Sequence, residues 1–144
     1  MAYDIQISLV DIYLMETKTA FAPLLTLNQG TTDIDFYKNA FGATENFRIL
    51  NDDGSIHVAE LVIDDAVFHL HEMMPQHMHK VSPDANKGTT VVIGLFVANV
   101  KADFDQAIAA GATIISPVID YEYGYRQGEL QDPFGHRWTI QCRI

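Results

Sequence analysis

The sequence predicts an α+β fold built from two tandem copies of a βαβββ module. The first observation is an internal echo: Asp-Phe at 35–36, followed by Gly-Ala-Thr at 42–44, recurs one residue longer as Asp-Phe at 103–104 and Gly-Ala-Thr at 111–113. The second is the order of elements, because each half reads as a strand, a helix and three further strands. A period of about 70 residues that occurs only twice indicates a duplicated module and not a solenoid.

Module one is predicted at about 21–72. The segment 21–28 is short and apolar, which indicates a largely buried strand, and Pro23 places it at an edge or at its first residues. Thr31 or Thr32 is expected to cap the next helix, and Gly42 to end it. Turn residues then separate three strands of a meander, predicted at 43–50, 55–63 and 66–72.

Module two is predicted at about 89–144, after a polar, histidine-rich connector at 73–88. Its first strand is the β-branched segment 89–97. Asn99 is expected to cap a helix at 100–110 that Gly111 terminates. The remaining strands are predicted at 113–118, 125–131 and 137–144. Residues 21–144 therefore form a single domain, with residues 1–20 as an N-terminal extension.

Composition limits the class of protein. The chain has 144 residues, of which 48% are hydrophobic, so one domain is the default. No apolar run approaches the ~18 residues of a membrane span, and Asp4 and Asp11 break the N-terminal stretch, which makes a poor signal peptide. We therefore predict a cytoplasmic protein, and its single cysteine, Cys142, is compatible with a reducing compartment.

Charge argues against two kinds of partner. Nineteen acidic residues against nine basic ones give a formal net charge of −10. A surface of this sign repels phosphate backbones and anionic lipid. We therefore expect no nucleic-acid partner and no membrane partner.

Several short motifs carry a family resemblance. They are Phe36-Tyr37 with Phe41-Gly42-Ala43, then Ala109-Ala110-Gly111-Ala112, and then Gly124-x-Arg126 leading to Asp132-Pro133-Phe134-Gly135-His136-x-Trp138. Over about 21–143 the chain resembles the vicinal oxygen chelate superfamily of glyoxalases, bleomycin resistance proteins and dioxygenases, and within it the PhnB-like branch. The resemblance implies mixed sheets that curl around a pocket, with helices on their outer faces. It also implies a homodimer.

The resemblance further implies a divalent metal, held by one side chain from each of the first, fourth, fifth and eighth strands. Here those positions fall on Ala22, His69, Val92 and Thr139. Alanine and valine have no lone pairs to offer, so only His69 is a good ligand. We therefore expect no metal and no other cofactor, with His69 as the ligand if a divalent metal binds.

Strand alternation predicts the lining of the pocket. If His69 faces inward, Val67 and His71 face inward with it. The same alternation on the other strands adds Thr26, Asn28, Phe96, Thr139 and Gln141. This mixed polar and aromatic lining suits a small, partly apolar ligand.

The role of His69 has three interpretations. It acts as a general base on a carbon acid, it ligates a metal with replacement partners such as His57 or Glu60, or it is a hydrogen-bonded lining residue. His57 and Glu60 are three positions apart, so only a bulge would bring both to one face of the strand. His71 has the same lining and chemical alternatives.

Tyr125 and Arg126 belong to a second polar and aromatic cluster, with Tyr121 and Tyr123. An arginine beside tyrosines can clamp a carboxylate or stack on a ring, which predicts ligand contact. The alternative is a salt bridge from Arg126 to Asp132 or Glu129. The connector, with its histidines and methionines, is interpreted as a lid over the pocket, or alternatively as a metal-binding tract.

Two functions follow from these patterns. The first is a metal-free protein that binds a small molecule in a homodimer pocket, in the manner of the bleomycin resistance branch. The second is a glyoxalase-like lyase or isomerase of a small carbonyl compound, with His69 as base or as metal ligand. The alternating segment 5–9 lies outside the duplicated core and favours the homodimer, because such a segment can add to a sheet edge.

Overall fold

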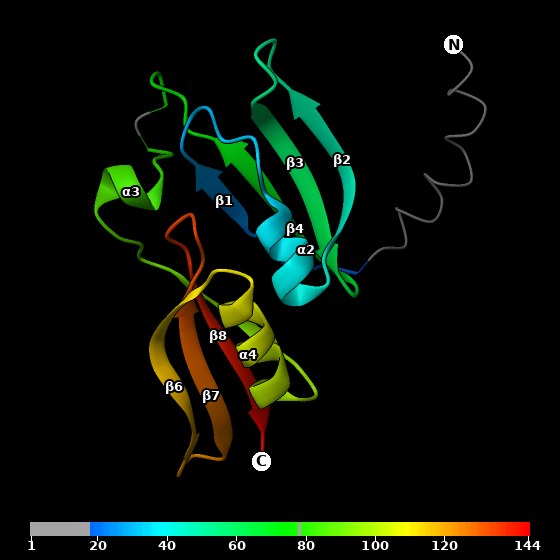
Figure 1. Cartoon of the computed structure of the whole chain (residues 1–144), viewed down its shortest axis with the longest axis vertical. Coiled ribbons are helices and arrows are strands. Elements are labelled where there is room, and N and C mark those ends of the chain that lie inside the picture. The colour runs from blue at the N-terminus through cyan, green and yellow to red at the C-terminus, as the bar shows by residue number, and fades with distance from the viewer. Residues whose placement is uncertain (1–17, 78) are drawn as a thin grey trace, which may run out of the picture.

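A computed structural model describes residues 18–77 and 79–144, in which two four-stranded mixed sheets and three helices form two modules (Figure 1). The predicted strand at 5–9 lies outside the described residues. Module one contains β1 (Leu24–Leu27), α2 (Asp35–Phe41), β2 (Thr44–Leu50), β3 (Ile56–Ile63) and β4 (Ala66–Glu72). Module two contains β5 (Val92–Phe96), α4 (Val100–Ala109), β6 (Thr113–Tyr121), β7 (Tyr125–Gln131) and β8 (Arg137–Arg143).

The two sheets have the same topology, which confirms the predicted duplication. Sheet one has the order β1-β4-β3-β2 and sheet two the order β5-β8-β7-β6. In each sheet the first strand of the module pairs in parallel with the last, and the other pairs are antiparallel. A parallel pair needs a crossover connection, and the long path through the helix and two strands supplies it.

The start of α2 differs from the prediction. Thr31 donates its hydroxyl to the carbonyl of Asn28 at 2.8 Å, and the helix begins after Ile34 without a side-chain cap. Asp33 instead accepts the backbone N–H of Asp35 at 2.9 Å. The end of the helix agrees with the prediction, because Gly42 adopts the left-handed conformation with φ 67°.

The helix of module two follows its predicted cap. The side chain of Asn99 accepts the N–H of Ala102 at 3.1 Å. A short helix in the connector, α3 (Pro83–Asn86), was not predicted from the sequence. Ser82 caps it, accepting the N–H of Ala85 at 3.2 Å. Strand β6 also runs past Pro117 to Tyr121, with irregular pairing on both sides of Ser116 that accommodates the proline.

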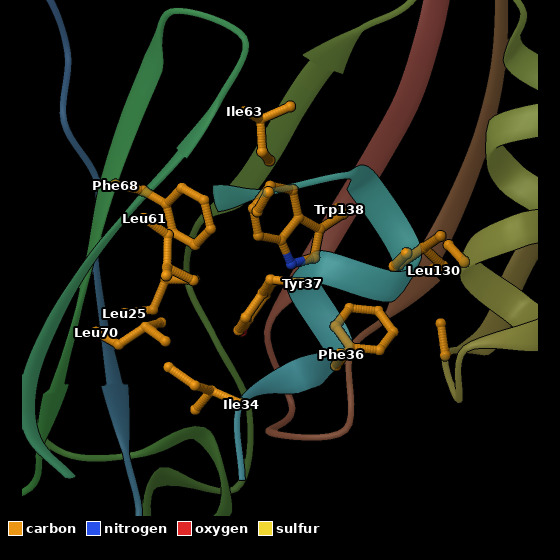
Figure 2. Packing of buried hydrophobic residues seen from close by; sticks show 14 of the residues in the cluster. Leu25, Ile34, Phe36, Tyr37, Leu61, Ile63, Phe68, Leu70, Leu130 and Trp138 are labelled. Atoms are coloured by element: carbon orange, nitrogen blue, oxygen red, sulfur yellow. The ribbon is translucent and has the colours of Figure 1, made fainter. Parts of the chain in front are cut away.

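One aromatic core joins the modules (Figure 2). Tyr37 of α2 lies 5.3 Å from Phe68 of β4 and 6.0 Å from Trp138 of β8, measured between ring centroids. Phe41 lies 4.9 Å from Trp138. Because these rings come from both sheets, the modules share their hydrophobic interior.

Within 18–77 and 79–144, each sheet has one face against a helix and one face that no helix covers. On β4, Phe68 and Leu70 are buried on the side of α2. On β8, Trp138 and Ile140 are buried on the side of the helices. Among the described residues, no helix is long and apolar enough to cross a membrane.

Candidate functional site

The helix-free face of sheet one, called open face one, collects the polar side chains of module one. Pairing places Leu24 opposite His69 and Thr26 opposite His71 between β1 and β4. Glu60 of β3 pairs with His69, and Phe47 of β2 pairs with Glu60. Residues paired across a sheet share a face, so Val67, His69 and His71 lie together on open face one, with Thr26 at its edge.

His69 is held by a carboxylate on this face. Its Nε2 lies 2.9 Å from Glu60 Oε1, and Asn46 donates its amide to Glu60 Oε2, also at 2.9 Å. The amide of Asn46 is the main cause that lowers the pKa of Glu60, and the hydrogen bond from His69 adds to it. Glu60 is therefore ionised at neutral pH and fixes the orientation of the imidazole.

A bulge brings His57 to the same end of the sheet as His71. The β2–β3 pairing shifts between Ile49 and Leu50, so that Val58 and Ile56 become consecutive partners and His57 is the extra residue. The rings of His57 and His71 are 4.8 Å apart. His57 Nδ1 lies 2.8 Å from Glu72 Oε1, and His71 donates from Nδ1 to the Glu72 carbonyl at 2.7 Å. The bulge that the straight-strand argument required is thus present, beside His71.

The helix-free face of sheet two, called open face two, contains a chain of amides. Thr139 pairs with Gly94 of β5, and Gln141 pairs with Phe96. Gln127 donates from Nε2 to Gln141 Oε1 at 2.6 Å. A Cβ on Gly94 would lie 2.7 Å from Gln141 Nε2, so glycine at this position lets the Gln141 amide lie against β5.

Phe96 and Tyr125 lie together at one end of open face two. Their ring centroids are 5.9 Å apart, and Arg143 pairs with Tyr125 across β7 and β8. The Arg143 guanidinium carbon is 4.4 Å from the Phe96 centroid and 5.7 Å from that of Tyr125. The arginine that accompanies these rings is therefore Arg143, a residue that sequence reasoning missed because it did not continue the alternation to the last residues.

Arg126 lies on the opposite face, which corrects its predicted place among the ligand-contacting residues. It pairs with Cys142 across β7 and β8, and odd and even positions of a strand point to opposite sides. Its guanidinium donates two hydrogen bonds to Asp120, at 2.7 and 3.1 Å. Arg126 therefore forms a salt bridge, but its partner is Asp120 and not the predicted Asp132 or Glu129. This bond lowers the pKa of Asp120.

Asn28 serves the connector instead of the open face. Its side-chain oxygen accepts the hydroxyl of Ser82 at 2.6 Å, and its amide lies 3.5 Å from Asp84. Both partners belong to α3 or its cap. The prediction placed Asn28 on the pocket face because it continued the β1 alternation beyond Leu27, where the strand ends.

The connector walls a cavity between the modules. This cavity has a volume of about 570 Å³ and lies among β1, the connector and β5. At its wall, His136 Nε2 donates to the carbonyl of Thr26 at 2.9 Å and so links the β7–β8 turn to β1. A smaller cavity of about 70 Å³ lies between the end of β4 and the connector residues Met74 and His77. The connector therefore contacts the edge of open face one near His71.

The four positions implied for a metal provide a poor ligand set. Ala22 precedes β1, and the residue paired with His69 on that strand is Leu24. On β5, Val92 pairs with Arg137 and Gly94 with Thr139. None of the four residues Ala22, Leu24, Val92 and Gly94 has a side-chain donor atom for a metal, so the residues at these positions of the first and fifth strands do not fit the metal site. Across 18–77 and 79–144, no three His, Cys, Asp or Glu side chains form a group able to hold a metal ion.

Comparison with known proteins gives one consistent result. A family model described as the Glyoxalase/Bleomycin resistance protein/Dioxygenase superfamily matches residues 26–140. The Uncharacterized protein Rv0887c of Mycobacterium tuberculosis is 35% identical over 132 residues, which are 90% of this chain and 78% of that protein. 

Two solved structures have the same fold. A gene product from Arabidopsis thaliana superposes with a TM-score of 0.65 at 25% identity, over 86% of this chain and 98% of that one. TioX from Micromonospora sp. ML1 superposes with a TM-score of 0.64 at 22% identity, over 87% and 100% of the two chains.

Proposed function

Because the chain belongs to the glyoxalase/bleomycin resistance protein/dioxygenase superfamily, we propose that it binds a small, partly apolar molecule in a metal-independent manner and does so as a homodimer. We place this activity in the cytoplasm and the chain in the PhnB-like branch, on the composition and the motifs described above. The observation that carries the proposal is that each open face combines apolar side chains with polar side chains held by hydrogen bonds.

Open face one supports the proposed ligand class. Phe47 and Ile49 of β2 are 43% and 52% exposed, beside the Glu60–His69 pair. An apolar wall next to a few fixed polar groups binds small molecules that combine a hydrocarbon part with one or two polar groups. Val67 and Thr26 complete this mixed lining.

The same exposure supports the homodimer. Ile119 of β6, which pairs with Gln127 on open face two, is also about half exposed, at 47%, so both open faces leave apolar side chains in water. A second copy seated over the open faces would remove this surface from water and enclose the ligand, which is favourable at roughly 25 cal/mol per Å².

A second function is favoured by the geometry of His69. A carboxylate that accepts a hydrogen bond from one nitrogen of a neutral imidazole fixes its tautomer, so that the other nitrogen carries the lone pair. His69 and Glu60 have this arrangement, with 2.9 Å between Nε2 and Oε1. In this alternative, His69 would remove a proton next to the carbonyl of a small substrate, as a glyoxalase-like isomerase or lyase does, without a metal.

Two measurements test these proposals. Protein purified without chelator is expected to contain less than stoichiometric zinc, nickel, manganese or iron, and a stoichiometric metal would contradict metal-independent binding. For the enzymatic alternative, dihydroxyacetone in deuterium oxide reports proton removal by NMR. His69→Ala should abolish the exchange that the wild-type protein catalyses, and Glu60→Gln should slow it. If exchange with the wild-type protein were no faster than in buffer alone, the proposal that His69 acts as a base would be rejected.

The binding proposal is tested by NMR titration of the chelator-treated protein with a set of small ketones, aldehydes and aromatic acids. Binding should shift backbone amides of β4 and β8 and survive chelation. The proposal would be contradicted if no compound in the set shifted the amide signals of either open face at millimolar concentration. In the deuterium exchange experiment, His79→Ala in the connector is the matched control for His69→Ala.

A further inference from the structure

Four exposed or half-buried rings form a continuous row at the end of open face two, called the aromatic row. It consists of Phe96, Tyr121, Tyr123 and Tyr125. Tyr121 and Tyr123 are stacked, with 5.1 Å between centroids and 21° between planes. Tyr125 continues the row, 5.7 Å from Tyr123 and 5.9 Å from Phe96. Tyr123 is 65% exposed and Phe96 is 50% exposed, so the rings present their surfaces to solvent.

Packing within the core does not explain this row. The buried aromatic side chains are concentrated around Tyr37 and Trp138, on the helix side of the sheets. Phe96 and Tyr125 project from the opposite side, because they share the face of Gln141 and Arg143. A group of exposed rings costs hydrophobic free energy in the isolated chain, and such patches commonly mark binding surfaces.

A cation accompanies the row. Arg143 is exposed and holds its guanidinium 4.4 Å from the centroid of Phe96, in a cation–π contact. The ion pairs found among the described residues engage Arg48, Arg126 and Arg137 but not Arg143. In a chain with a net charge of −10, this guanidinium is a local positive group whose planar fork matches a carboxylate.

Hydrogen-bond donors extend from the row along the sheet. Tyr123 donates its hydroxyl to Gln127 Oε1 at 2.5 Å, and Gln127 donates to Gln141 Oε1 at 2.6 Å. This direction leaves the NH₂ group of Gln141 at the end of the chain, over Gly94. Its donors and the Arg143 fork both favour an acceptor or an anion, and the two residues lie on the same face of β8, because they are two positions apart.

We infer that the aromatic row and Arg143 bind a planar aromatic anion, with its ring along the tyrosines and its carboxylate or similar group on the guanidinium. The inference rests on the proposed binding function and specifies its ligand class. The rings provide the stacking surface, Arg143 provides charge complementarity, and Gln141 provides a donor for a second polar substituent.

The probe for this inference is 2-naphthoate, titrated into the full chain and followed by ¹H–¹⁵N NMR. Shifts are expected at residues 94–96, 121–127 and 141–144. Arg143→Gln should weaken the binding at least about tenfold, the loss typical of one charge-assisted hydrogen bond. The neutral 2-naphthamide should bind more weakly than 2-naphthoate by a similar factor, and cyclohexanecarboxylate should lose the stacking contribution.

Arg126→Gln is the matched control, because Arg126 is also an exposed arginine at this end of the sheet but projects from the other face. It should leave the affinity for 2-naphthoate unchanged. Equal effects of the two arginine substitutions, or shifts confined to other regions, would overturn the inference while leaving the proposed binding function intact. Tyr125→Leu gives an independent check, since it removes stacking without changing charge and should also weaken binding.

Discussion

Tyr37 donates its hydroxyl to Asp132 at 2.6 Å inside the core, joining the helix of module one to the β7–β8 turn of module two. The same carboxylate oxygen accepts the indole N–H of Trp138 at 3.0 Å. Its second oxygen accepts the backbone N–H groups of Phe134 and His136 at 2.9 and 3.0 Å. Asp132 is 2% exposed, and four donors satisfy its charge.

The first prediction concerns this bond. Tyr37→Phe removes one of the four donors to the buried carboxylate, so it should lower the free energy of unfolding by about 1–3 kcal/mol. Urea unfolding followed by circular dichroism measures the change. Tyr123→Phe is the control, because its hydroxyl bonds at the surface and its loss should change stability by less than about 0.5 kcal/mol. Equal stability of wild type and Tyr37→Phe would contradict this account.

The same residue predicts an alkaline pH dependence. Burial, followed by the charge and hydrogen bond of Asp132, raises the pKa of Tyr37 well above its ordinary value near 10. Above that pH the unfolded chain releases this proton and the folded chain retains it, so stability falls as pH rises. The slope contributed is at most about 1.4 kcal/mol per pH unit. Urea unfolding of the wild type and of Tyr37→Phe should be compared between about pH 9 and about pH 11, on either side of the ordinary pKa of tyrosine. The free energy of unfolding should decline less steeply with pH in Tyr37→Phe than in the wild type.

Glu60 gives a prediction about open face one. Because hydrogen bonds from Asn46 and His69, and the charge of His69, lower the pKa of Glu60, Asn46→Ala and His69→Ala should each raise it toward the ordinary value. Carboxyl ¹³C NMR titration measures the change. Asn51→Ala is the control, since Asn51 bonds to Glu72 and not to Glu60. An unchanged pKa of Glu60 in Asn46→Ala would contradict the proposed cause.

Gly128 tests how α4 packs on sheet two. A Cβ at this position would lie 2.7 Å from a ring carbon of Phe104 and 2.8 Å from a methyl of Val118. Gly128→Ala should therefore destabilise the chain by about 1–3 kcal/mol through overpacking. Phe104→Leu in the same background should recover part of this loss, because the smaller side chain leaves room for the methyl group. Additive losses in the double variant, measured by urea unfolding, would contradict the proposed clash.

The homodimer is tested on the exposed face of β2. Ile49→Asp places a charge on a half-exposed apolar position and should shift the mass in light scattering from dimer to monomer. Lys101→Asp on α4 changes a highly exposed position on the helix side and should leave the mass unchanged. A monomeric wild-type chain would contradict the proposal itself.

Sequence periodicity predicted the strands well where local signals were strong. Strand β7 occupies the predicted 125–131, and the Asn99 cap and Gly42 termination are as expected, since each depends on residues close in the chain. Helix α3 was missed because four residues provide too little periodicity. The predicted cap by Thr31 or Thr32 is not formed, and Asp33 instead accepts the backbone N–H of Asp35.

The candidate site was predictable in part for the same reason. Alternation places Val67, His69 and His71 on one face without any knowledge of the partner strand. Arg126 and Asn28 failed for different reasons: Arg126 has the opposite strand parity, and Asn28 lies beyond the end of β1. Glu60 became a partner of His69 only through the register between β3 and β4, which local sequence does not specify.

The sequence by itself determined the duplicated βαβββ order and the side chains at the four positions where the family resemblance implies a metal, because spacing and side-chain identity are local properties. Tertiary structure alone decided that Asp132 would join the modules, that Glu60 would orient His69, and that Arg143 would lie over Phe96. Each of these relationships links elements distant in sequence, and strand register and helix packing set them only when the whole core forms.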